Sequence, residues 1–281
     1  MRAVVVGPEG EAALAEVPEP EGPGDLFRVV ACGLCGSDVE KLDAAHAGVV
    51  LGHEVVGEAA DGRRVALVHH TPCGACERCR AGHETTCKRF AAPTIRPGGF
   101  AERVRADGWV ELPEEWPAWR GTMVEPLACV LRGVQRVPQG RVLIVGNGFV
   151  GRLVGAVLER RDSEVFAVDT DPRRAGRAPD GPVDAAVLCG QGGVETALET
   201  LAPGGTLLVF ADAGRIPAED VYRRELTAVG SRSATPAAMQ EAVALLDELE
   251  VPEPTVLPLE RFVDGLSLFR GRDALKVVFT P

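Results

Sequence analysis

Four cysteines lie close together in one short loop, and their spacing constrains the local fold more than any other feature of the chain. In the run PCGACERCRAGHETTC they follow the pattern Cys-x2-Cys-x2-Cys-x7-Cys, with prolines and glycines that favour tight turns. A closed shell of four thiolates is the ligand set that Zn²⁺ prefers in structural sites, whereas a disulfide pair and an iron–sulfur cluster are the alternatives. The spacing favours a structural zinc site formed by Cys73, Cys76, Cys79 and Cys87.

The composition is that of a globular protein whose length suggests two domains. The chain has 281 residues, of which 46% are hydrophobic and 25% charged, and its net charge of −11 argues against nucleic-acid or anionic-membrane partners. The N-terminal run does not resemble a signal peptide, and no stretch approaches the roughly 18 apolar residues of a membrane span. We expect a cytoplasmic location, where the cysteines would be reduced and would serve as metal ligands or buried small residues.

The hydrophobic pattern changes near Gly140. Before it, short apolar runs separated by Gly and Pro predict the strands Arg2–Val6, Leu26–Ala31, Glu54–Ala59, Arg64–Leu67 and Phe100–Val104. After it, helices at Val150–Arg160 and Val194–Leu201 alternate with strands at Arg141–Val145, Glu164–Val168, Ala185–Cys189, Thr206–Phe210 and Leu226–Val229. This alternation predicts an α/β fold with a doubly wound parallel sheet. A capped helix at Pro236–Leu249 and a strand near Leu275–Phe279 follow.

A glycine-rich run follows the first strand of this second half and opens its first helix. A G-x-G-x-x-G run alone is a weak signal, but this context is the one that a dinucleotide-binding turn requires. The first glycine permits the turn, the second lets a pyrophosphate approach the backbone, and the third lets helix and strand pack closely. The helix N-terminus offers N–H groups to the phosphates. The candidate cofactor-binding residues of this run are Gly146, Gly148, Phe149, Val150 and Gly151.

Asp169 ends the next predicted strand, about 20 residues after the glycine-rich run, which suits a carboxylate that accepts hydrogen bonds from the adenosine ribose. Such a carboxylate would repel a 2′-phosphate, so NAD is favoured over NADP. A role as a plain turn residue in DTDP is the alternative. Arg173 and Arg174 weaken the preference, because either could reach a phosphate, although a solvated basic pair is the simpler interpretation. Arg174 is kept as a candidate cofactor ligand.

A second metal site is predicted from residues far apart in the sequence. Cys35 and His53 are candidate ligands, and a catalytic zinc needs about three protein ligands and one open position. Glu54 is either a fourth ligand or a supporting partner. Glu125 is the preferred third ligand, but Cys129 lies four residues later on a predicted helix and competes for this role. A redox role for the C-x-x-C run that ends at Cys35 is disfavoured, because the run leaves a strand and does not open a helix of a redox fold.

These elements together resemble the zinc-dependent medium-chain dehydrogenase/reductase superfamily, in its polyol, sorbitol and threonine dehydrogenase-like branch. Several of the motifs are weak individually, but they occur in the family's order and cover nearly the whole chain. The motifs are CGLCGSD at 32–38, LGHEVVG at 51–57, the lobe run at 69–87, GGFAE at 98–102, VEPLACVLRGV at 124–134, VGNGFVG at 145–151, RRELTAVGS at 223–231 and ALKVVF at 274–279.

The resemblance implies a GroES-like β-barrel catalytic domain made of residues 1–124 and 233–281, with the zinc lobe at 72–88. It also implies a Rossmann dinucleotide-binding domain at 125–232 and an active cleft at the junction. In the family, the cysteine and histidine that match Cys35 and His53 bind the catalytic zinc. The glutamate that matches Glu54 binds or supports this zinc. The glutamate at the position of Glu125 completes the shell or exchanges into it, and the serine at that of Ser37 relays the proton.

The chain is shorter than the family pattern by roughly a fifth. Only the segment 170–184 separates Asp169 from the next predicted strand, whereas a strand-to-strand crossover unit needs about 30 residues. The third strand, which lies at the edge in the order 3-2-1-4-5-6, is therefore predicted to be lost or reduced. Loss of an edge strand leaves the sheet continuous, but it exposes the side of the adenosine pocket and would lower cofactor affinity unless another segment covers the gap.

Three functions compete. The favoured one is an NAD- and zinc-dependent dehydrogenase that acts on a secondary alcohol, a polyol or an amino alcohol, or on the corresponding ketone. The second is an NADP-dependent carbonyl reductase of a specialised pathway, and the third is a degenerate family member that acts as a binding protein. Folding alone does not demand the retained set of Cys35, Ser37, His53, Glu54 and Glu125, which argues against the third. The resemblance also implies a homodimer or homotetramer, with strand Leu226–Val229 as the candidate interface.

Overall fold

The computed structural model describes residues 1–90, 92 and 94–281 and divides the chain into two compact units. Unit 1 comprises Met1–Pro126, Ala234–Ala244 and Pro252–Pro281, and unit 2 comprises Leu127–Ser233 and Leu245–Val251. This division differs from the expected one in placing Leu245–Val251 with the second unit. Two helices, α4 (Val124–Val134) and α8 (Pro236–Leu246), contain residues of both units. No helix in the described part of the chain is both long and apolar enough to cross a membrane.

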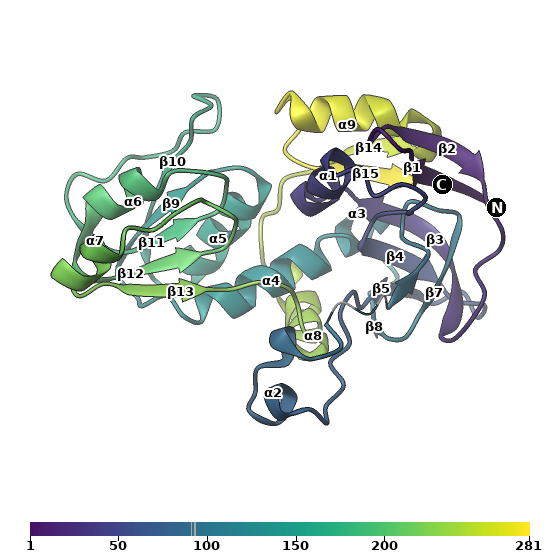
Figure 1. The fold of residues 1–281 in the computed structure, drawn as a ribbon, viewed down its shortest axis with the longest axis horizontal. Helices are drawn as coiled ribbons and strands as arrows, with labels where there is room; N and C mark the ends of the chain where they lie inside the picture. The colour runs from purple at the N-terminus through teal and green to yellow at the C-terminus, as the bar shows by residue number, and fades with distance from the viewer. Residues whose placement is uncertain (91, 93) are drawn as a thin grey trace. The chain divides into compact units, whose positions relative to one another are not determined.

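Unit 1 is built on a curled, mostly antiparallel sheet (Figure 1). Its main path runs in the order β14-β15-β3-β4-β5-β8, and β7 pairs with both β3 and β6. β1 and β2 form a separate antiparallel pair. The strands are β1 (Arg2–Val6), β2 (Ala12–Glu16), β3 (Asp25–Gly33), β4 (Glu54–Glu58), β5 (Arg64–Leu67), β6 (Ile95–Arg96), β7 (Arg103–Ala106), β8 (Trp109–Glu111), β14 (Thr255–Pro258) and β15 (Val277–Thr280).

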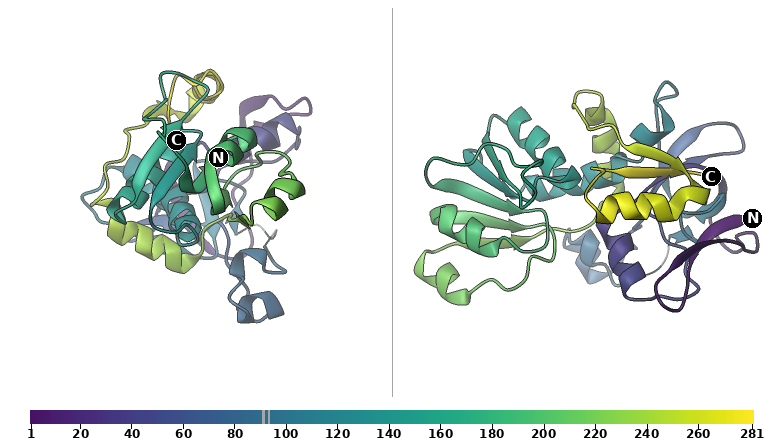
Figure 2. Two further views of the ribbon diagram at one scale, coloured as in Figure 1. Left: turned by 90° about the vertical axis from the view of Figure 1, so that its left-hand side faces the viewer. Right: turned by 90° about the horizontal axis from the view of Figure 1, so that it is seen from above.

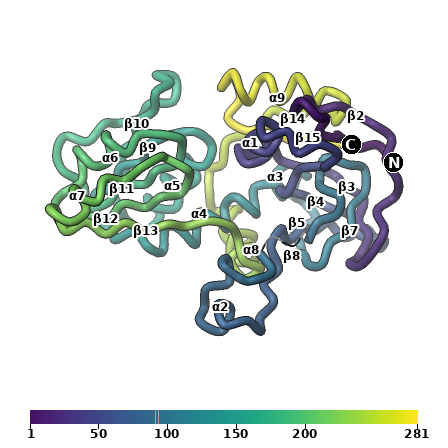
Figure 3. Tube along the Cα trace, in the orientation of Figure 1, coloured from purple at the N-terminus to yellow at the C-terminus, as the bar shows by residue number. Residues whose placement is uncertain are grey.

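The longest strand of this sheet, β3, shows why the sequence forms a two-faced sheet. Phe27, Val29 and Ala31 are buried, whereas Leu26 and Arg28 are exposed, which is the period of two expected for a strand with one face on the core. Near its end β3 pairs with β15 on one side and β4 on the other. The tube in Figure 3 shows the yellow C-terminal strand beside the purple strand β3 within this unit.

The helices of unit 1 are short and cover the ends and one face of the sheet. Phe262 of α9 lies 4.7 Å from Phe279 of β15 and 4.9 Å from Phe100, measured between ring centroids, so the C-terminal helix and strand complete the aromatic core. Gly265 of α9 has no room for a side chain, because a Cβ there would lie 2.4 Å from the Phe279 ring. The helices are α1 (Gly36–Asp43), α2 (Glu77–Arg80), α3 (Ala118–Gly121), α9 (Phe262–Arg270) and the 3-10 turns η1 (Glu84–Thr86) and η2 (Leu259–Arg261).

Unit 2 contains the predicted parallel sheet, in the order β10-β9-β11-β12-β13. Residues 169–182 form no strand, so β10 lies at the edge and the predicted loss of the third strand is confirmed. The α/β class is confirmed as well. The elements are β9 (Arg141–Val145), α5 (Phe149–Arg160), β10 (Glu164–Val168), β11 (Val183–Leu188), α6 (Val194–Thr200), β12 (Leu201–Val209), α7 (Ala218–Arg223) and β13 (Thr227–Gly230).

Helices lie on both faces of this sheet, as Figure 2 shows. Consecutive strand residues point to opposite faces. Ile144 of β9 faces α5, since its side chain lies 3.2 Å from where a Cβ on Gly151 would be. Its neighbour Leu143 belongs instead to the apolar cluster that includes Leu198 of α6. Strands covered on both faces must be apolar throughout, which explains the sequence RVLIV of β9.

The segment that replaces the missing strand covers the edge of β10. The Ala167 N–H donates to the Arg177 carbonyl at 3.0 Å, and the Gly176 N–H donates to the Ala167 carbonyl at 3.2 Å. The guanidinium carbons of Arg177 and Arg141 lie 4.2 and 4.7 Å from the centroid of the buried Phe166 ring. The segment therefore protects this edge with two backbone hydrogen bonds and the Arg177 cation–π contact, and Arg141 of β9 contacts the same ring.

Several boundaries differ from expectation. The predicted strand Phe100–Val104 is displaced to β7, and the predicted helix Pro236–Leu249 ends at Leu246. The start of that helix is as predicted, because the Thr235 hydroxyl accepts a hydrogen bond from the Ala238 N–H at 3.3 Å. The elements β2, β14, α7 and α9 were not predicted, since their apolar residues are few or follow a period broken by glycine and proline.

We predict that Gly176→Pro destabilises unit 2. The substitution removes the N–H that donates to Ala167, and loss of one hydrogen bond costs about 1 kcal/mol. Hydrogen exchange should report faster exchange of the Ala167 amide. Gly176→Ala is the matched control, because it keeps the donor and shares the added Cβ, which would lie 3.1 Å from the Ala167 Cβ. Equal exchange rates in the two variants would contradict the proposed role of this segment as an edge cover.

Candidate active site and metal centres

Three of the predicted catalytic ligands converge in unit 1. Cys35 is the N-cap of α1, His53 directly precedes β4, and Glu54 is the first residue of that strand. One ligand atom from each of the three lies within 4.8 Å of the others. A thiolate, an imidazole and a carboxylate at this separation are a donor set that suits Zn²⁺.

The first turn of α1 organises this group through Asp38. One oxygen of its carboxylate accepts a hydrogen bond from the Cys35 N–H at 3.1 Å. The other accepts one from the Gly52 N–H at 3.2 Å and contacts His53 Nδ1 at 3.3 Å. Asp38 thereby joins the cysteine and histidine segments, and the Nδ1 contact leaves Nε2 of His53 for a metal.

The electrostatics of this pair follow from its burial. Asp38 is fully buried, and burial raises its pKa, but the charge of His53 and the hydrogen bonds that Asp38 accepts outweigh that effect and lower the pKa below its usual value. Burial likewise lowers the His53 pKa, and the Asp38 carboxylate overcomes this and raises it well above 6.5. The carboxylate therefore stabilises positive charge at the imidazole, whether from a proton or from a metal.

Glu54 is buried and forms an ion pair with Lys276, the residue before β15. Lys276 also donates a hydrogen bond to the Leu34 carbonyl at 3.0 Å. Gly33 lies between the two partners, because it pairs with Glu54 of β4 on one side and with Val278 of β15 on the other. A Cβ on Gly33 would lie 2.0 Å from Glu54 Oε2 and 3.1 Å from Lys276 Cε, so only glycine leaves room for this pair.

Lys276 is charged in this environment. Burial lowers its pKa, but Glu54 and the other acidic groups nearby outweigh burial and raise the pKa above 10.5. The ammonium compensates the charge of the Glu54 carboxylate in the buried site. Glu54 is thus equipped either to bind a metal or to support the ligands beside it.

Glu125 and Cys129 lie on α4, one turn apart. Glu125 is 7% exposed in the first turn, and Cys129 is half-buried. Among the described residues, the group with mutually close ligand atoms contains only Cys35, His53 and Glu54. Glu125 as a further ligand, in preference to Cys129, therefore stays a prediction. Cys32, the other cysteine of the C-x-x-C run, is 1% exposed within the apolar core, and burial raises its pKa well above 9.0.

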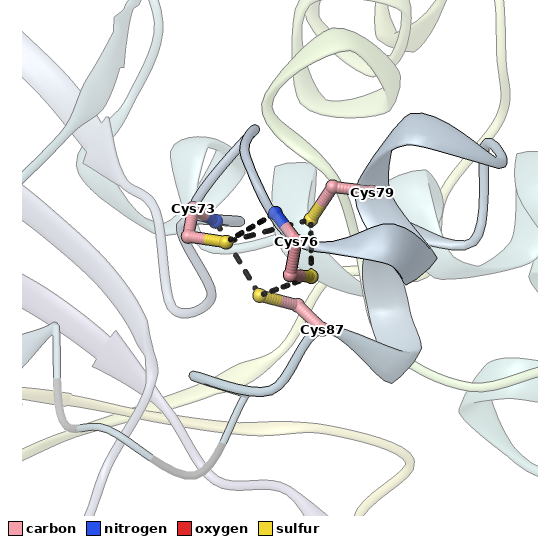
Figure 4. Close-up of side chains that lie close together, drawn as sticks. All are labelled: Cys73, Cys76, Cys79 and Cys87. Atoms are coloured by element: carbon pink, nitrogen blue, oxygen red, sulfur yellow. Dashed lines mark hydrogen bonds between the residues drawn. The ribbon is translucent and has the colours of Figure 1, made fainter.

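The four cysteines of the lobe point toward one another (Figure 4). The Sγ–Sγ distance is 3.5 Å for Cys76–Cys79 and 3.9 Å for both Cys73–Cys79 and Cys76–Cys87. Four sulfurs about 2.3 Å from a tetrahedral zinc would be about 3.8 Å apart. The lobe therefore has the dimensions that a zinc ion requires.

Backbone N–H groups also point at these sulfurs. Those of Cys76 and Arg89 donate to the sulfurs of Cys73 and Cys87, each at 3.3 Å. Backbone donors lower the pKa of Cys76 to about 6, and they lower that of Cys87 below its usual value. Burial and the neighbouring thiols raise the pKa of Cys79 to about 12. The donors favour the thiolate form that binds metals.

A stack of rings extends from His53. The ring centroids of His53 and His69 are 4.7 Å apart, those of His69 and His70 are 3.9 Å apart, and those of His70 and Phe90 are 3.9 Å apart. Burial, together with the neighbouring imidazoles, lowers the pKa of His69 to about 2, so this ring is neutral near neutral pH. His46 and His83 are exposed and lie outside the stack.

The glycine-rich turn of unit 2 has the backbone that a dinucleotide site needs. Gly146 has a φ of +96°, and a Cβ on Gly151 would lie 2.1 Å from the Gly146 carbonyl oxygen. Gly148 caps α5, and a Cβ there would meet only an Arg174 guanidinium nitrogen, at 3.5 Å. The turn is thus tight at two glycines and open at the third, where Phe149, Val150 and the first helical turn begin.

Asp169 lies beside this turn, where its carboxylate accepts hydrogen bonds from the N–H groups of Asn147 and Asp171, both at 2.8 Å. Arg173 forms a fork with the Asp171 carboxylate, in which Nη2 lies 2.8 Å from Oδ2. Arg174 Nε also lies 3.8 Å from Asp171 Oδ2, but its Nη1 reaches the glycine-rich turn, 3.5 Å from where a Cβ on Gly148 would be. The two arginines that the sequence could not distinguish therefore have different surroundings.

Sequence reasoning missed two residues of the metal group. Asp38 was noted only as part of a motif, although its position one turn after Cys35 places it on the same helix face. Lys276 was passed over as part of a C-terminal strand. A lysine inside an otherwise apolar run, ALKVVF, was the available signal that a buried anion lies nearby.

Comparison with known proteins identifies similar chains. The alcohol dehydrogenase GroES-like domain family matches residues 24–114. The chain is 31% identical to D-altritol 5-dehydrogenase of Agrobacterium fabrum, over 88% of each chain. It is 26% identical to sorbitol dehydrogenase of Halalkalibacterium halodurans, over 97% of this chain and 96% of the relative.

The crystal structure of Escherichia coli L-idonate 5-dehydrogenase shares the fold, with a TM-score of 0.86 at 23% identity, over 100% of this chain and 98% of that one. The resemblance inferred from the motifs is confirmed, and so is the GroES-like assignment of the curled sheet.

We predict that Lys276→Met destabilises the protein by about 3–5 kcal/mol, because it leaves the Glu54 carboxylate buried without its cation. Urea denaturation at a fixed zinc concentration measures the effect. The double variant Lys276→Met/Glu54→Gln is the control, since removal of both charges should recover most of the loss. If the double variant is no more stable than Lys276→Met, the loss arises from packing and the ion pair is not its cause.

Proposed function

The chain belongs to the polyol dehydrogenase branch of the zinc-type medium-chain dehydrogenase/reductase superfamily, and we propose that it oxidises a polyol or another secondary alcohol with NAD at a zinc site formed by Cys35 and His53. The reaction class, oxidoreduction of an alcohol or polyol, is that of its relatives. The observation that carries the proposal is the convergence of Cys35, His53 and Glu54 beside Asp38 and Lys276.

In this proposal Cys35 and His53 hold the catalytic zinc, and Glu54 binds or supports it, with Glu125 as a further ligand. A zinc ion held there supplies Lewis-acid chemistry, which favours loss of the proton from an alcohol near neutral pH. Asp38 keeps the His53 ring oriented, and Lys276 pairs with the Glu54 carboxylate. The four lobe cysteines hold a structural zinc.

Ser37 is the candidate proton carrier. Its half-buried hydroxyl donates to Cys35 Sγ at 3.5 Å, so it lies beside the metal group and is not sealed in the core. A hydroxyl both donates and accepts hydrogen bonds, so it can take the proton of the alcohol and pass it toward water.

Unit 2 is proposed to bind NAD through the glycine-rich turn and Asp169. The residues Gly146, Gly148, Phe149, Val150 and Gly151 surround the pyrophosphate, and Arg174 adds a positive charge there. The Asp169 carboxylate accepts hydrogen bonds from the adenosine ribose and opposes a 2′-phosphate. NAD held there would supply the hydride acceptor. The alternative is NADP, which is favoured only by the guanidinium of Arg174.

A homodimer or homotetramer is also proposed, through strand β13. This strand ends the parallel sheet, and three of its four residues are exposed, so its outer edge is available for pairing with a second copy. The mass of the purified protein in solution tests this proposal.

The experiment that tests the function is a polyol oxidation assay on zinc-replete protein. We expect NAD-dependent oxidation of sorbitol or altritol and two bound zinc ions per chain, one for each group of close ligand atoms. Cys35→Ala should lose the activity and one zinc, whereas His83→Ala, an exposed residue of the lobe, should keep both. A zinc-replete protein that oxidises no alcohol with NAD or NADP would exclude the proposal and favour a binding role.

A second prediction concerns cofactor choice. Asp169→Asn removes a charged acceptor, and hydrogen bonds to charged groups are worth about 1.5–3 kcal/mol, so NADH binding should weaken about 10- to 100-fold while NADPH binding does not. Nicotinamide fluorescence measures both. The asparagine keeps one oxygen, so it retains one of the two backbone hydrogen bonds that the two Asp169 oxygens now accept. Unchanged NADPH binding therefore also shows that the turn keeps its shape. Tighter binding of NADPH than of NADH by the unchanged protein would refute the NAD assignment.

A further inference from the structure

An uninterrupted stack of rings joins the candidate catalytic ligand His53 to the four-cysteine lobe. From His53 the centroid separations are 4.7 Å to His69, 3.9 Å on to His70 and 3.9 Å on to Phe90. The last pair is nearly parallel, with 23° between ring planes. We term His69, His70 and Phe90 the ring column. All three residues belong to unit 1.

Both ends of the ring column are attached to residues of a metal group. At one end, His69 packs on the ring of His53 itself. At the other, the Phe90 N–H donates to the Cys87 carbonyl at 3.0 Å, and the Arg89 N–H donates to the Cys87 sulfur at 3.3 Å. A displacement of Cys87 is therefore transmitted to Phe90 through the backbone.

The backbone under the ring column is fixed independently of the lobe. The Val68 N–H donates to the Gly108 carbonyl at 2.9 Å, and the Thr94 hydroxyl hydrogen bonds to the carbonyls of Val68 and His69. The main chain at His69 is thus held by the sheet side of the unit. The side-chain rings of His69, His70 and Phe90 can still turn, and each is in contact with the next ring of the column.

His53 needs such a neighbour. The Asp38 contact at Nδ1 fixes the direction of one ring edge, but it does not fix the tilt about that contact. The terminal torsion of a histidine side chain is intrinsically broad, so packing must select the tilt. The His69 ring, inclined by 32°, contacts the imidazole and supplies that packing.

The lobe has little to hold it together except its sulfurs. Neither α2 nor η1 contains a buried residue, and Cys87, at 5% exposed, is the one buried residue in the lobe between 72 and 88. A metal bound by all four sulfurs, which lie 3.5–3.9 Å apart, would crosslink a segment that has no apolar core of its own. The position of Cys87 therefore depends on metal occupancy.

We propose that the ring column transmits the metal occupancy of the four-cysteine lobe to His53, so that a loaded lobe sets the geometry and affinity of the catalytic metal site. His69, His70 and Phe90 are positioning residues in this scheme, since they act through His53. The inference rests on the proposed zinc sites, but not on which alcohol is oxidised.

The test uses full-length protein with Co²⁺ in the catalytic site and Zn²⁺ in the lobe, without substrate or cofactor. The readouts are the visible ligand-field bands of Co²⁺ and its affinity. Phe90→Leu removes the last ring and should shift the bands and weaken Co²⁺ binding about 10- to 100-fold, the usual effect of losing a group that orients a ligand. Phe90→Tyr keeps the ring and should restore both. His83→Ala, on the lobe but outside the ring column, should leave both unchanged.

A second comparison tests the transmission itself. Cys79→Ser weakens the lobe site and should shift the bands in the otherwise unchanged protein, but it should add no further shift when combined with Phe90→Leu. If Phe90→Leu does not fold, His70→Leu against His70→Phe gives the same contrast between a lost and a kept ring.

Unchanged bands in Phe90→Leu, or equal shifts from Cys79→Ser with and without the ring, would overturn the proposal. These outcomes are separate from failure of the proposed function. A protein that oxidises no polyol can still show the shift, and an active dehydrogenase can lack it.

Discussion

The burial of one carboxylate, Glu54, is the constraint on which the metal group depends. A charge with almost no exposure is stable only beside a partner, and the partner, Lys276, comes from the far end of the sequence. Strands β4, β3 and β15 must therefore lie in that order, and β3 must have a glycine where the pair crosses it. The strand order that closes the core also brings the Lys276 ammonium to the Glu54 carboxylate, and the two groups meet across Gly33.

The two metal groups are stabilised in different ways. The group of Cys35 and His53 is supported from outside, by a fully buried Asp38 and by the strands of the sheet around it. The lobe has no comparable core, and its sulfurs are ordered by each other and by backbone donors. One candidate site is held by the fold around it, whereas a metal bound at the other would contribute folding free energy to its own segment. The ring column connects the two groups, since it packs on His53 at one end and is joined to Cys87 at the other.

Motifs with local chemical requirements were readable from the sequence. The four cysteines, the glycine-rich turn and the lost edge strand follow from spacing alone, because turns, thiolates and crossovers have fixed dimensions. The roles of Asp38 and Lys276 could not be read from the sequence. Their partners are known only once the strands have paired and brought His53 and Glu54 next to them. Boundaries such as that of β7 also depend on pairing across the sheet rather than on local pattern.

The order in which the strands are synthesised determines when Glu54 can pair with Lys276. During translation, β3 and β4 emerge long before β15, with the whole of the parallel-sheet unit made in between. At about 5–20 residues per second, the nascent chain carries Glu54 for some 10–45 s before Lys276 exists. Over that interval the carboxylate must stay hydrated, so the sheet edge that β15 will occupy stays open. The carboxylate and its cation are thus brought together late, after the parallel-sheet unit has had time to fold.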